Sequence, residues 1–163
     1  MLKLTKKADY GLIALKHLAV NQARGSSSAK EIADCYGIPL PLLSKILQKL
    51  GKAGFLQSVQ GTNGGYKLAR DAREITTLEV IRSIDGPIVL TACFTEHGFC
   101  THSDRCNVRE PLRKVHEGIL RLLSSISIAD MSNAAENTEL EPAKLYGLTP
   151  TATPPTIMRN KSI

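Results

Sequence analysis

Three cysteines stand close together in the second half of the chain, at Cys93, Cys100 and Cys106. Six residues separate the first pair and five the second, so one short segment carries three thiols. Thiolates are soft ligands that suit iron–sulfur clusters and zinc. The spacing is wider than the Cys-x-x-Cys pairs typical of structural zinc sites. The cysteines alone leave three interpretations open: a cluster, a zinc site or a set of free thiols.

A second set of side chains is suited to DNA, and it lies on a helix predicted to run from Pro39 to about Ala53. Four aliphatic residues fall on one face of that helix: Leu43, Ile46, Leu47 and Leu50. The opposite face carries Ser44, Lys45, Gln48, Lys49 and Lys52. Ser and Gln hydrogen-bond base edges, whereas Lys reaches phosphates or guanine. The helix is therefore predicted to be a recognition helix.

A glycine-rich hairpin is predicted immediately after this helix. Two short strands, over 55–60 and 66–70, flank the loop Gly-Thr-Asn-Gly-Gly at 61–65. Glycines let a main chain approach a phosphate closely, and basic residues flank them. The residues assigned to DNA contact in this wing are Gln60, Gly61, Gly64, Gly65, Tyr66 and Lys67.

Charge is divided unevenly along the 163 residues. Residues 1–70 hold eleven Lys and Arg against three acidic residues, a net charge of +8. Residues 71–163 hold ten basic and twelve acidic residues, a net charge of −2. A basic half favours a polyanionic partner. Each of these features alone fits an ordinary solvated surface, but helix, hairpin and charge together predict binding to double-stranded DNA.

Local signals mark the elements that would position these side chains. Apolar residues spaced by four, three and four predict a helix over 5–20. Ser28 and Glu31 form a capping box that opens a short second helix. Thr76 and Glu79 form another, opening a helix that ends near Gly86. Helix, helix, turn, helix and hairpin predict a winged helix-turn-helix domain over 1–86.

The remaining chain is divided into a loop, a helix and a tail. Residues 87–107 are predicted to be a loop that contains the cysteines. Residues 108–132 are predicted to be one long dimerisation helix, because an apolar seam alternates in steps of four and three: Val108, Leu112, Val115, Ile119, Leu122 and Ile126. Residues 133–163 lack periodicity and are predicted to be a flexible tail. The fold class is mainly α with a small β-hairpin, and the seam predicts a homodimer.

Residues 1–132 resemble the Rrf2 family of bacterial transcription regulators, which includes IscR-type and NsrR-type members. The resemblance is carried by Lys3-Leu4-Thr5 with Tyr10 and Ala14, the turn Gly37-Ile38-Pro39, the segment from Leu43 to Leu47 with Ala53-Gly54, the wing from Gly61 to Tyr66, and the three cysteines. Within the family, the stretches Ile88 to Cys93, Cys106 to Arg109 and Ile128 to Met131 are most similar to regulators of the SUF iron–sulfur assembly operon.

The resemblance implies an intertwined homodimer whose operator affinity is controlled by an iron–sulfur cluster on Cys93, Cys100 and Cys106. A 2Fe–2S cluster is favoured over a 4Fe–4S cluster. One departure concerns DNA, because Gln60 stands where some members carry an Arg available to the minor groove. Reading of a narrow A·T minor groove is therefore less expected here.

The fourth cluster ligand is left open by the resemblance. IscR-type members place a His three residues after the last cysteine, where this chain has Arg109. A guanidinium stays protonated and does not ligate metal. His102, with His97 nearby, is a nitrogen donor within the loop. Asp9 matches the position from which NsrR-type members supply a carboxylate from the partner chain. Asp9 and His102 are both retained as candidates.

Other functions remain as alternatives with distinct signatures. The same cluster in a repressor that senses nitric oxide or redox state is one, and a zinc-stabilised DNA-binding protein is another. An enzyme is the weakest, because no phosphate-binding loop, metalloprotease motif or nucleophile motif is present.

Neither a signal peptide nor a membrane span is expected, so the predicted location is cytoplasmic. Cys35 is interpreted as a small buried hydrophobe, and neither His17 nor His116 is assigned to the site.

Overall fold

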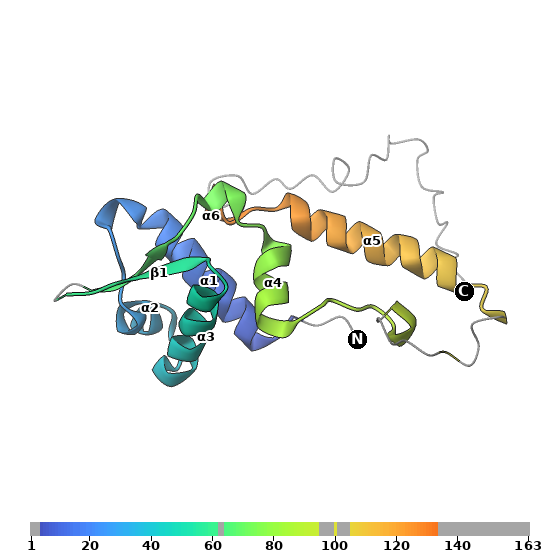
Figure 1. Ribbon diagram of the computed structural model, residues 1–163, viewed down its shortest axis with the longest axis horizontal. Coiled ribbons are helices and arrows are strands. Elements are labelled where there is room, and N and C mark those ends of the chain that lie inside the picture. The colour runs from blue at the N-terminus through green and yellow to red at the C-terminus, as the bar shows by residue number, and fades with distance from the viewer. Residues whose placement is uncertain (1–3, 62–63, 95–99, 101–104, 134–163) are drawn as a thin grey trace, which may run out of the picture.

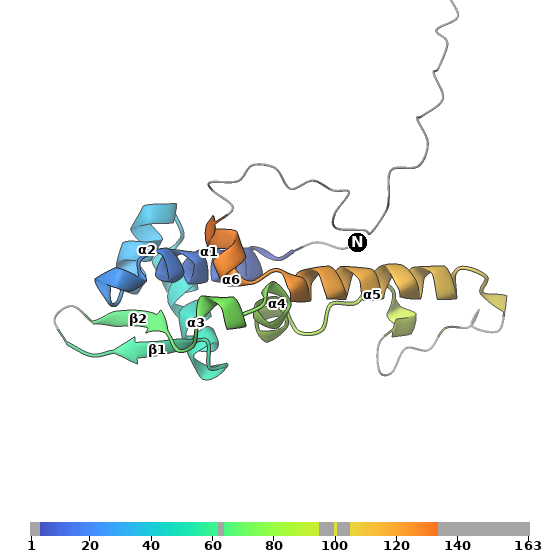
Figure 2. The same cartoon turned by 90° about the horizontal axis from the view of Figure 1, so that it is seen from above.

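The computed structural model describes residues 4–61, 64–94, 100 and 105–133. Figure 1 shows a body built from α1 to α4, α6 and the hairpin, with α5 projecting from it as a long arm. The hairpin extends at the opposite end of the molecule from α5, as the perpendicular view in Figure 2 also shows. His97, His102 and the predicted tail beyond Asn133 lie outside the described residues.

The order of elements confirms the predicted fold class. The α-helices are α1 (Lys6–Val20), α2 (Ala29–Tyr36), α3 (Leu40–Lys52), α4 (Thr77–Asp85), α5 (Arg109–Ser125) and α6 (Ile128–Asn133). Short 3₁₀ turns are η1 (Gln22–Arg24), η2 (Ala72–Glu74) and η3 (Ala92–Phe94). The hairpin strands are β1 (Leu56–Val59) and β2 (Gly65–Leu68).

Both predicted capping boxes are present and start their helices where the sequence indicated. Before α2, the Ser28 hydroxyl accepts from the N–H of Glu31 at 3.1 Å, and the Glu31 carboxylate accepts from the N–H of Ser28. Thr76 and Glu79 make the same reciprocal pair before α4. Each box satisfies main-chain donors that a helix start leaves without partners.

The core is formed where α1, α3 and α4 meet. All four aliphatic residues expected on the inner face of α3 are buried, as are most of those expected on α1. The largest fully buried side chains are Leu15, Ile32, Leu43, Leu47, Leu50, Ile75, Val80 and Ile128. This packing fixes which face of α3 is turned outward.

The helix predicted over 108–132 is two helices rather than one. Between α5 and α6, Ile126 adopts an extended conformation (φ −100°, ψ 113°). The Ser127 hydroxyl accepts from the Asp130 N–H at 3.1 Å, and the Asp130 carboxylate accepts from the Ser127 N–H at 2.8 Å. Hydrogen bonds from Ser127 lower the pKa of Asp130, which favours the charged form. This third capping box begins a new helix although the apolar periodicity continues through it.

The second of these helices, α6, returns the chain to the body. The Ile128 N–H donates to the Ile75 carbonyl at 2.9 Å, and the Thr77 N–H donates to the Ile126 carbonyl at 2.9 Å. The side chain of Ile128 is completely buried in the core. The body predicted to comprise residues 1–86 therefore also contains α6, and the projecting arm is α5.

The wing is held to the body through its second strand. β1 and β2 are antiparallel, with Leu56 opposite Leu68. The main chain of Tyr66 also pairs with that of Ser27, through N–H to carbonyl distances of 2.9 and 3.1 Å. A Cβ on Gly65 would lie 2.4 Å from the Ser27 carbonyl oxygen, so only glycine permits this approach. Gly65 therefore has a structural role in docking the wing.

His17 and Cys35 occupy environments that the sequence could not distinguish. His17 is buried, its Nδ1 lies 3.2 Å from the Tyr36 hydroxyl, and burial lowers its pKa. The expectation that Cys35 is buried is wrong, because its side chain is exposed. The inward face of α2 is made by Ile32 and Ala33, and Cys35 lies outside it.

Candidate DNA-binding surface and cysteine segment

The outward face of α3 carries the side chains expected to contact DNA. Lys45, Gln48, Lys49 and Lys52 are exposed, and Ser44 is half-buried near the start of the helix. Pro39 provides the helix start, and the last turn is closed by Gly54, whose N–H donates to the Gly51 carbonyl at 3.0 Å. The helix is thus fixed at both ends and by its buried leucines, leaving a polar, basic face toward solvent.

The basic residues of this region differ in what they contact. The Lys49 ammonium donates to the main-chain carbonyl of Ile84 at 2.8 Å. Arg70 lies over the Phe55 ring, 4.9 Å from its centroid, and 3.5 Å from the Glu79 carboxylate. Lys49 and Arg70 therefore each contact another group of the protein, although the Lys49 side chain is also exposed. Within the described ranges, Lys45, Lys52 and Lys67 make no ion pair. Helical periodicity does not distinguish the contacts of these basic side chains, because those contacts depend on tertiary packing.

The wing residues assigned to DNA are accessible but not equivalent. Gln60 and Gly61 are exposed at the end of β1, and Lys67 is exposed on β2, opposite Gln57. Gly61 has a φ of +121°, a conformation that side chains with a Cβ rarely adopt. Gly64 and Tyr66 are half-buried. The outer part of the wing is therefore free for a phosphate, while its base is used for packing.

We expect the double variant Lys45→Ala/Lys52→Ala to weaken binding to every duplex to a similar extent. Each phosphate contact contributes about one unit to the slope of log affinity against log salt, so the slope should fall by about two. The slope is measured by fluorescence anisotropy between about 50 and 200 mM salt. Lys114→Ala on α5 is the control and should leave the slope unchanged. An unchanged slope in the double variant would remove α3 from the DNA interface.

The three cysteines are free thiols of intermediate exposure. Cys93 lies in η3, where its sulfur is 3.0 Å from the Thr91 hydroxyl. Across residues 4–61, 64–94, 100 and 105–133, no three Cys, His, Asp or Glu side chains are gathered closely enough to hold a metal ion. The segment thus supplies three soft donors, but it does not present them as a ready-made centre.

The cysteine segment packs against the projecting helix. Phe94, next to Cys93, stacks on His116 of α5 with ring centroids 5.4 Å apart. The Nδ1 atom of His116 is buried, and it has no hydrogen-bond partner among the residues that the structure describes. Asp9, the candidate ligand on α1, is exposed in the first turn of that helix. No group of ligand side chains within the described part of one chain includes it.

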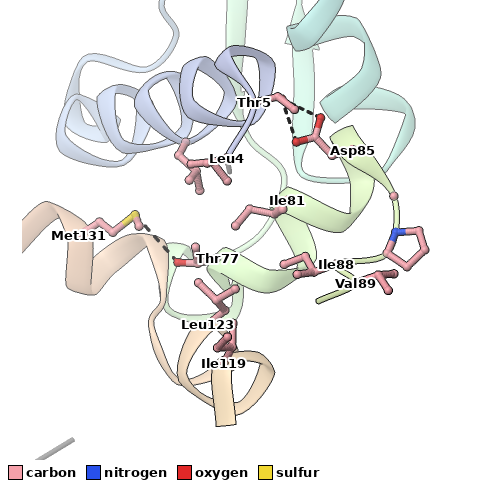
Figure 3. Close-up of a pocket in the computed structure, with 13 residues that line it drawn as sticks. Leu4, Thr5, Thr77, Ile81, Asp85, Ile88, Val89, Ile119, Leu123 and Met131 are labelled. Atoms are coloured by element: carbon pink, nitrogen blue, oxygen red, sulfur yellow. Dashed lines mark hydrogen bonds between the residues drawn. The ribbon is translucent and has the colours of Figure 1, made fainter. Parts of the chain in front are cut away.

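A cavity of about 500 Å³ lies where α1, α4, α5 and α6 meet. Figure 3 shows Leu4, Ile81, Ile119 and Leu123 around it, from the segment before α1, from α4 and from α5. Its one acidic side chain, Asp85, accepts a hydrogen bond from the Thr5 hydroxyl at 2.8 Å. An apolar cavity with a single engaged carboxylate does not provide the acid and base pair of a hydrolytic site.

The fold and this surface define the chain as a winged helix-turn-helix DNA-binding protein. It belongs to the Rrf2 family, whose model, described as an iron-dependent transcriptional regulator, matches residues 4–134. The sequence-based assignment to this family is thereby confirmed. Among the described residues, no helix is both long and apolar enough to cross a membrane.

Relatives with assigned names are transcription regulators, not enzymes. The chain is 34% identical to the HTH-type transcriptional regulator IscR of Photorhabdus laumondii, over 83% of this chain and 82% of that protein. It is 33% identical to the regulator NsrR of Geobacillus kaustophilus, over 80% of this chain and 89% of that protein. The absence of an enzymatic function, expected from the sequence, agrees with these relatives.

Solved structures show the same fold. The structure of T. potens IscR has a TM-score of 0.67 at 32% identity, covering 89% of this chain and 96% of that one. CymR, the global cysteine regulator of B. subtilis, has a TM-score of 0.72 at 27% identity, covering 82% of this chain and 98% of that one. Both similarities cover more than four fifths of this chain, so the architecture is that of the family.

Proposed function

We propose that this protein is a homodimeric transcription regulator whose operator affinity is controlled by an iron–sulfur cluster bound through Cys93, Cys100 and Cys106. The observation that carries the proposal is the place of these thiols. They lie on the segment that leaves α4 of the DNA-binding body and packs, through Phe94, on α5. A change at the thiols would therefore act on both the body and the arm.

The donor set fits a cluster in its chemistry. Three free thiols of intermediate exposure supply soft sulfur ligands, which iron–sulfur clusters require. Because the thiols are not already gathered, binding would have to draw them together, and metal affinity would be coupled to ordering of the segment. We propose a 2Fe–2S cluster. When bound, it supplies a redox-sensitive and oxygen-labile group, while the protein's residues hold it and report its presence.

A fourth ligand must complete the set, and Asp9 is the preferred candidate. Asp9 is exposed on α1, within the DNA-binding body. In a dimer, its carboxylate is available to the cysteine segment of the partner chain. Such a bond would join the two halves of the dimer through the cluster. His102 is the alternative donor from within the loop, and a non-cysteine ligand of either kind would tune the cluster's potential and stability.

Dimerisation through α5 is supported by the absence of any buried residue on that helix. α5 has 17 residues and carries apolar side chains along its length; Val115 within it and Val108 immediately before it are each 52% exposed. An amphipathic helix is normally stabilised by burying its apolar face. A symmetric pair of α5 helices would bury these residues and place two recognition helices on successive turns of a duplex.

The proposed targets are operators of genes for iron–sulfur assembly, read in the cytoplasm. Protein purified without oxygen should be brown and contain iron and sulfide in about equal amounts. Its affinity for a duplex selected from a random library should change at least ~5-fold when the cluster is removed.

A colourless protein with about one zinc per chain would replace this proposal with a zinc-stabilised DNA-binding protein. Cluster loss on exposure to nitric oxide, but not to air, would identify nitric oxide as the signal.

A further inference from the structure

The end of α4 is closed by a side chain of the recognition helix. The last four carbonyls of a helix lack main-chain partners within it. At the end of α4, the Gly86 N–H satisfies the Arg82 carbonyl at 3.0 Å. The Ile84 carbonyl is satisfied by the Lys49 ammonium at 2.8 Å. A cation at a helix C-terminus is also favoured by the helix dipole, so Lys49 acts as a cap for α4.

The same end of α4 is held on its other side by α1. The Thr5 hydroxyl, which caps α1, donates to the Asp85 carboxylate at 2.8 Å, as Figure 3 shows. The Ile84 side chain packs so closely on α1 that a Cβ at Gly11 would lie 2.3 Å from its Cδ1. Ile84 and Asp85 are therefore held between α1 and the recognition helix.

This fixed end leads directly into the cysteine segment. α4 stops at Gly86, which has a φ of +85°. Ile88 and Val89 then line the cavity beside α5, and Cys93 follows in η3. Along the chain, the C-terminal turn of α4 is the first part of the DNA-binding body that a displacement of the cysteine segment would reach. In that turn, the hydrogen bond to the recognition helix is the one made by Lys49.

We propose that Lys49 is a positioning residue that transmits the state of the cysteine segment to the recognition helix, and that it is not a phosphate contact. Its hydrogen bond to Ile84 sets the position of α3 relative to α4. The recognition helix then moves with the end of α4 when the cysteine segment changes. This inference rests on the proposed control by a cluster, and it replaces the expectation that Lys49 contacts DNA.

The test compares Lys49→Met with Lys52→Met, using the duplex selected for tightest binding to the cluster-loaded protein. Methionine keeps a long unbranched side chain but removes the charge and the donor. In Lys49→Met, the ratio of affinities between cluster-loaded and cluster-free protein should fall at least ~5-fold, with an unchanged salt slope. In Lys52→Met, the salt slope should fall by about one, while the ratio of affinities should remain that of the wild-type protein. Lys49→Arg, which keeps a cationic donor, should restore most of the ratio.

The inference would be overturned if Lys49→Met lowered the salt slope of DNA affinity by about one and left the ratio of cluster-loaded to cluster-free affinity unchanged. Lys49 would then be a phosphate contact. Amide hydrogen exchange on cluster-free protein provides a measurement that does not depend on the cluster. Exchange at Gly86 and in the last turn of α4 should be at least ~5-fold faster in Lys49→Met than in Lys52→Met. If the wild-type protein shows no cluster dependence, the proposed function fails, and equal exchange in the two variants would separately refute the role of Lys49.

Discussion

Val115→Glu is expected to convert the dimer into a monomer and to weaken operator binding by ~100-fold or more, about 2.8 kcal/mol. Val115 lies midway along α5 and is 52% exposed in one chain. A symmetric interface would bring the two introduced carboxylates near each other, in a place where apolar contact is lost. The monomer would keep one recognition helix and lose the contacts of the second half-site.

The fold of each chain should survive this change, because Val115 packs outside the core and Glu is a better helix former than Val. Circular dichroism should therefore be unchanged, while sedimentation at micromolar concentration should show a halved mass. Val20→Glu is the matched control, since Val20 is 61% exposed on α1 and outside the proposed interface. Ile119→Glu is less informative, because Ile119 also lines the cavity against α4. A Val115→Glu protein that remains dimeric would exclude α5 as the interface.

Cys106→Ala is expected to abolish stable cluster binding and the cluster-dependent change in operator affinity. Removal of a group that only hydrogen-bonds a metal ligand already lowers metal affinity by about 10–100-fold. Removal of a ligand itself should lower the affinity by at least as much. Protein purified without oxygen should then have less than about one tenth of the wild-type visible absorption. Cluster-free Cys106→Ala and cluster-free wild type should bind DNA equally, because Cys106 lies outside the winged helix.

Cys35→Ala is the control, since Cys35 is an exposed thiol on α2 in the DNA-binding body. It should retain full absorption and normal regulation. Asp9→Ala should give an intermediate result, in which the cluster forms with a shifted spectrum and is lost faster in air. If His102→Ala shifts the spectrum and Asp9→Ala does not, the fourth ligand comes from the loop. Full absorption in Cys106→Ala would exclude this cysteine as a ligand.

Local features of this fold were predictable because the interactions that create them lie within a few residues. The capping boxes at Ser28 and Thr76 depend on a partner three positions later, and the structure contains both. The inner face of α3 follows from helical periodicity. The third capping box, at Ser127 and Asp130, has an equally local signal. Apolar periodicity that continues through Ile126 conceals this signal, because it predicts one uninterrupted helix.

The sequence by itself therefore determined the class of protein, the helix and hairpin of the winged fold and the positions of the three thiols. Only the tertiary structure decided what the outward side chains contact. Periodicity shows that Lys49 leaves α3 on the outer side, but the carbonyl that it meets belongs to a residue 35 positions later. Gly65 is likewise explained by the main chain of Ser27, far earlier in the chain. Such distances follow from how whole helices and strands pack, because packing brings together groups that share no local pattern.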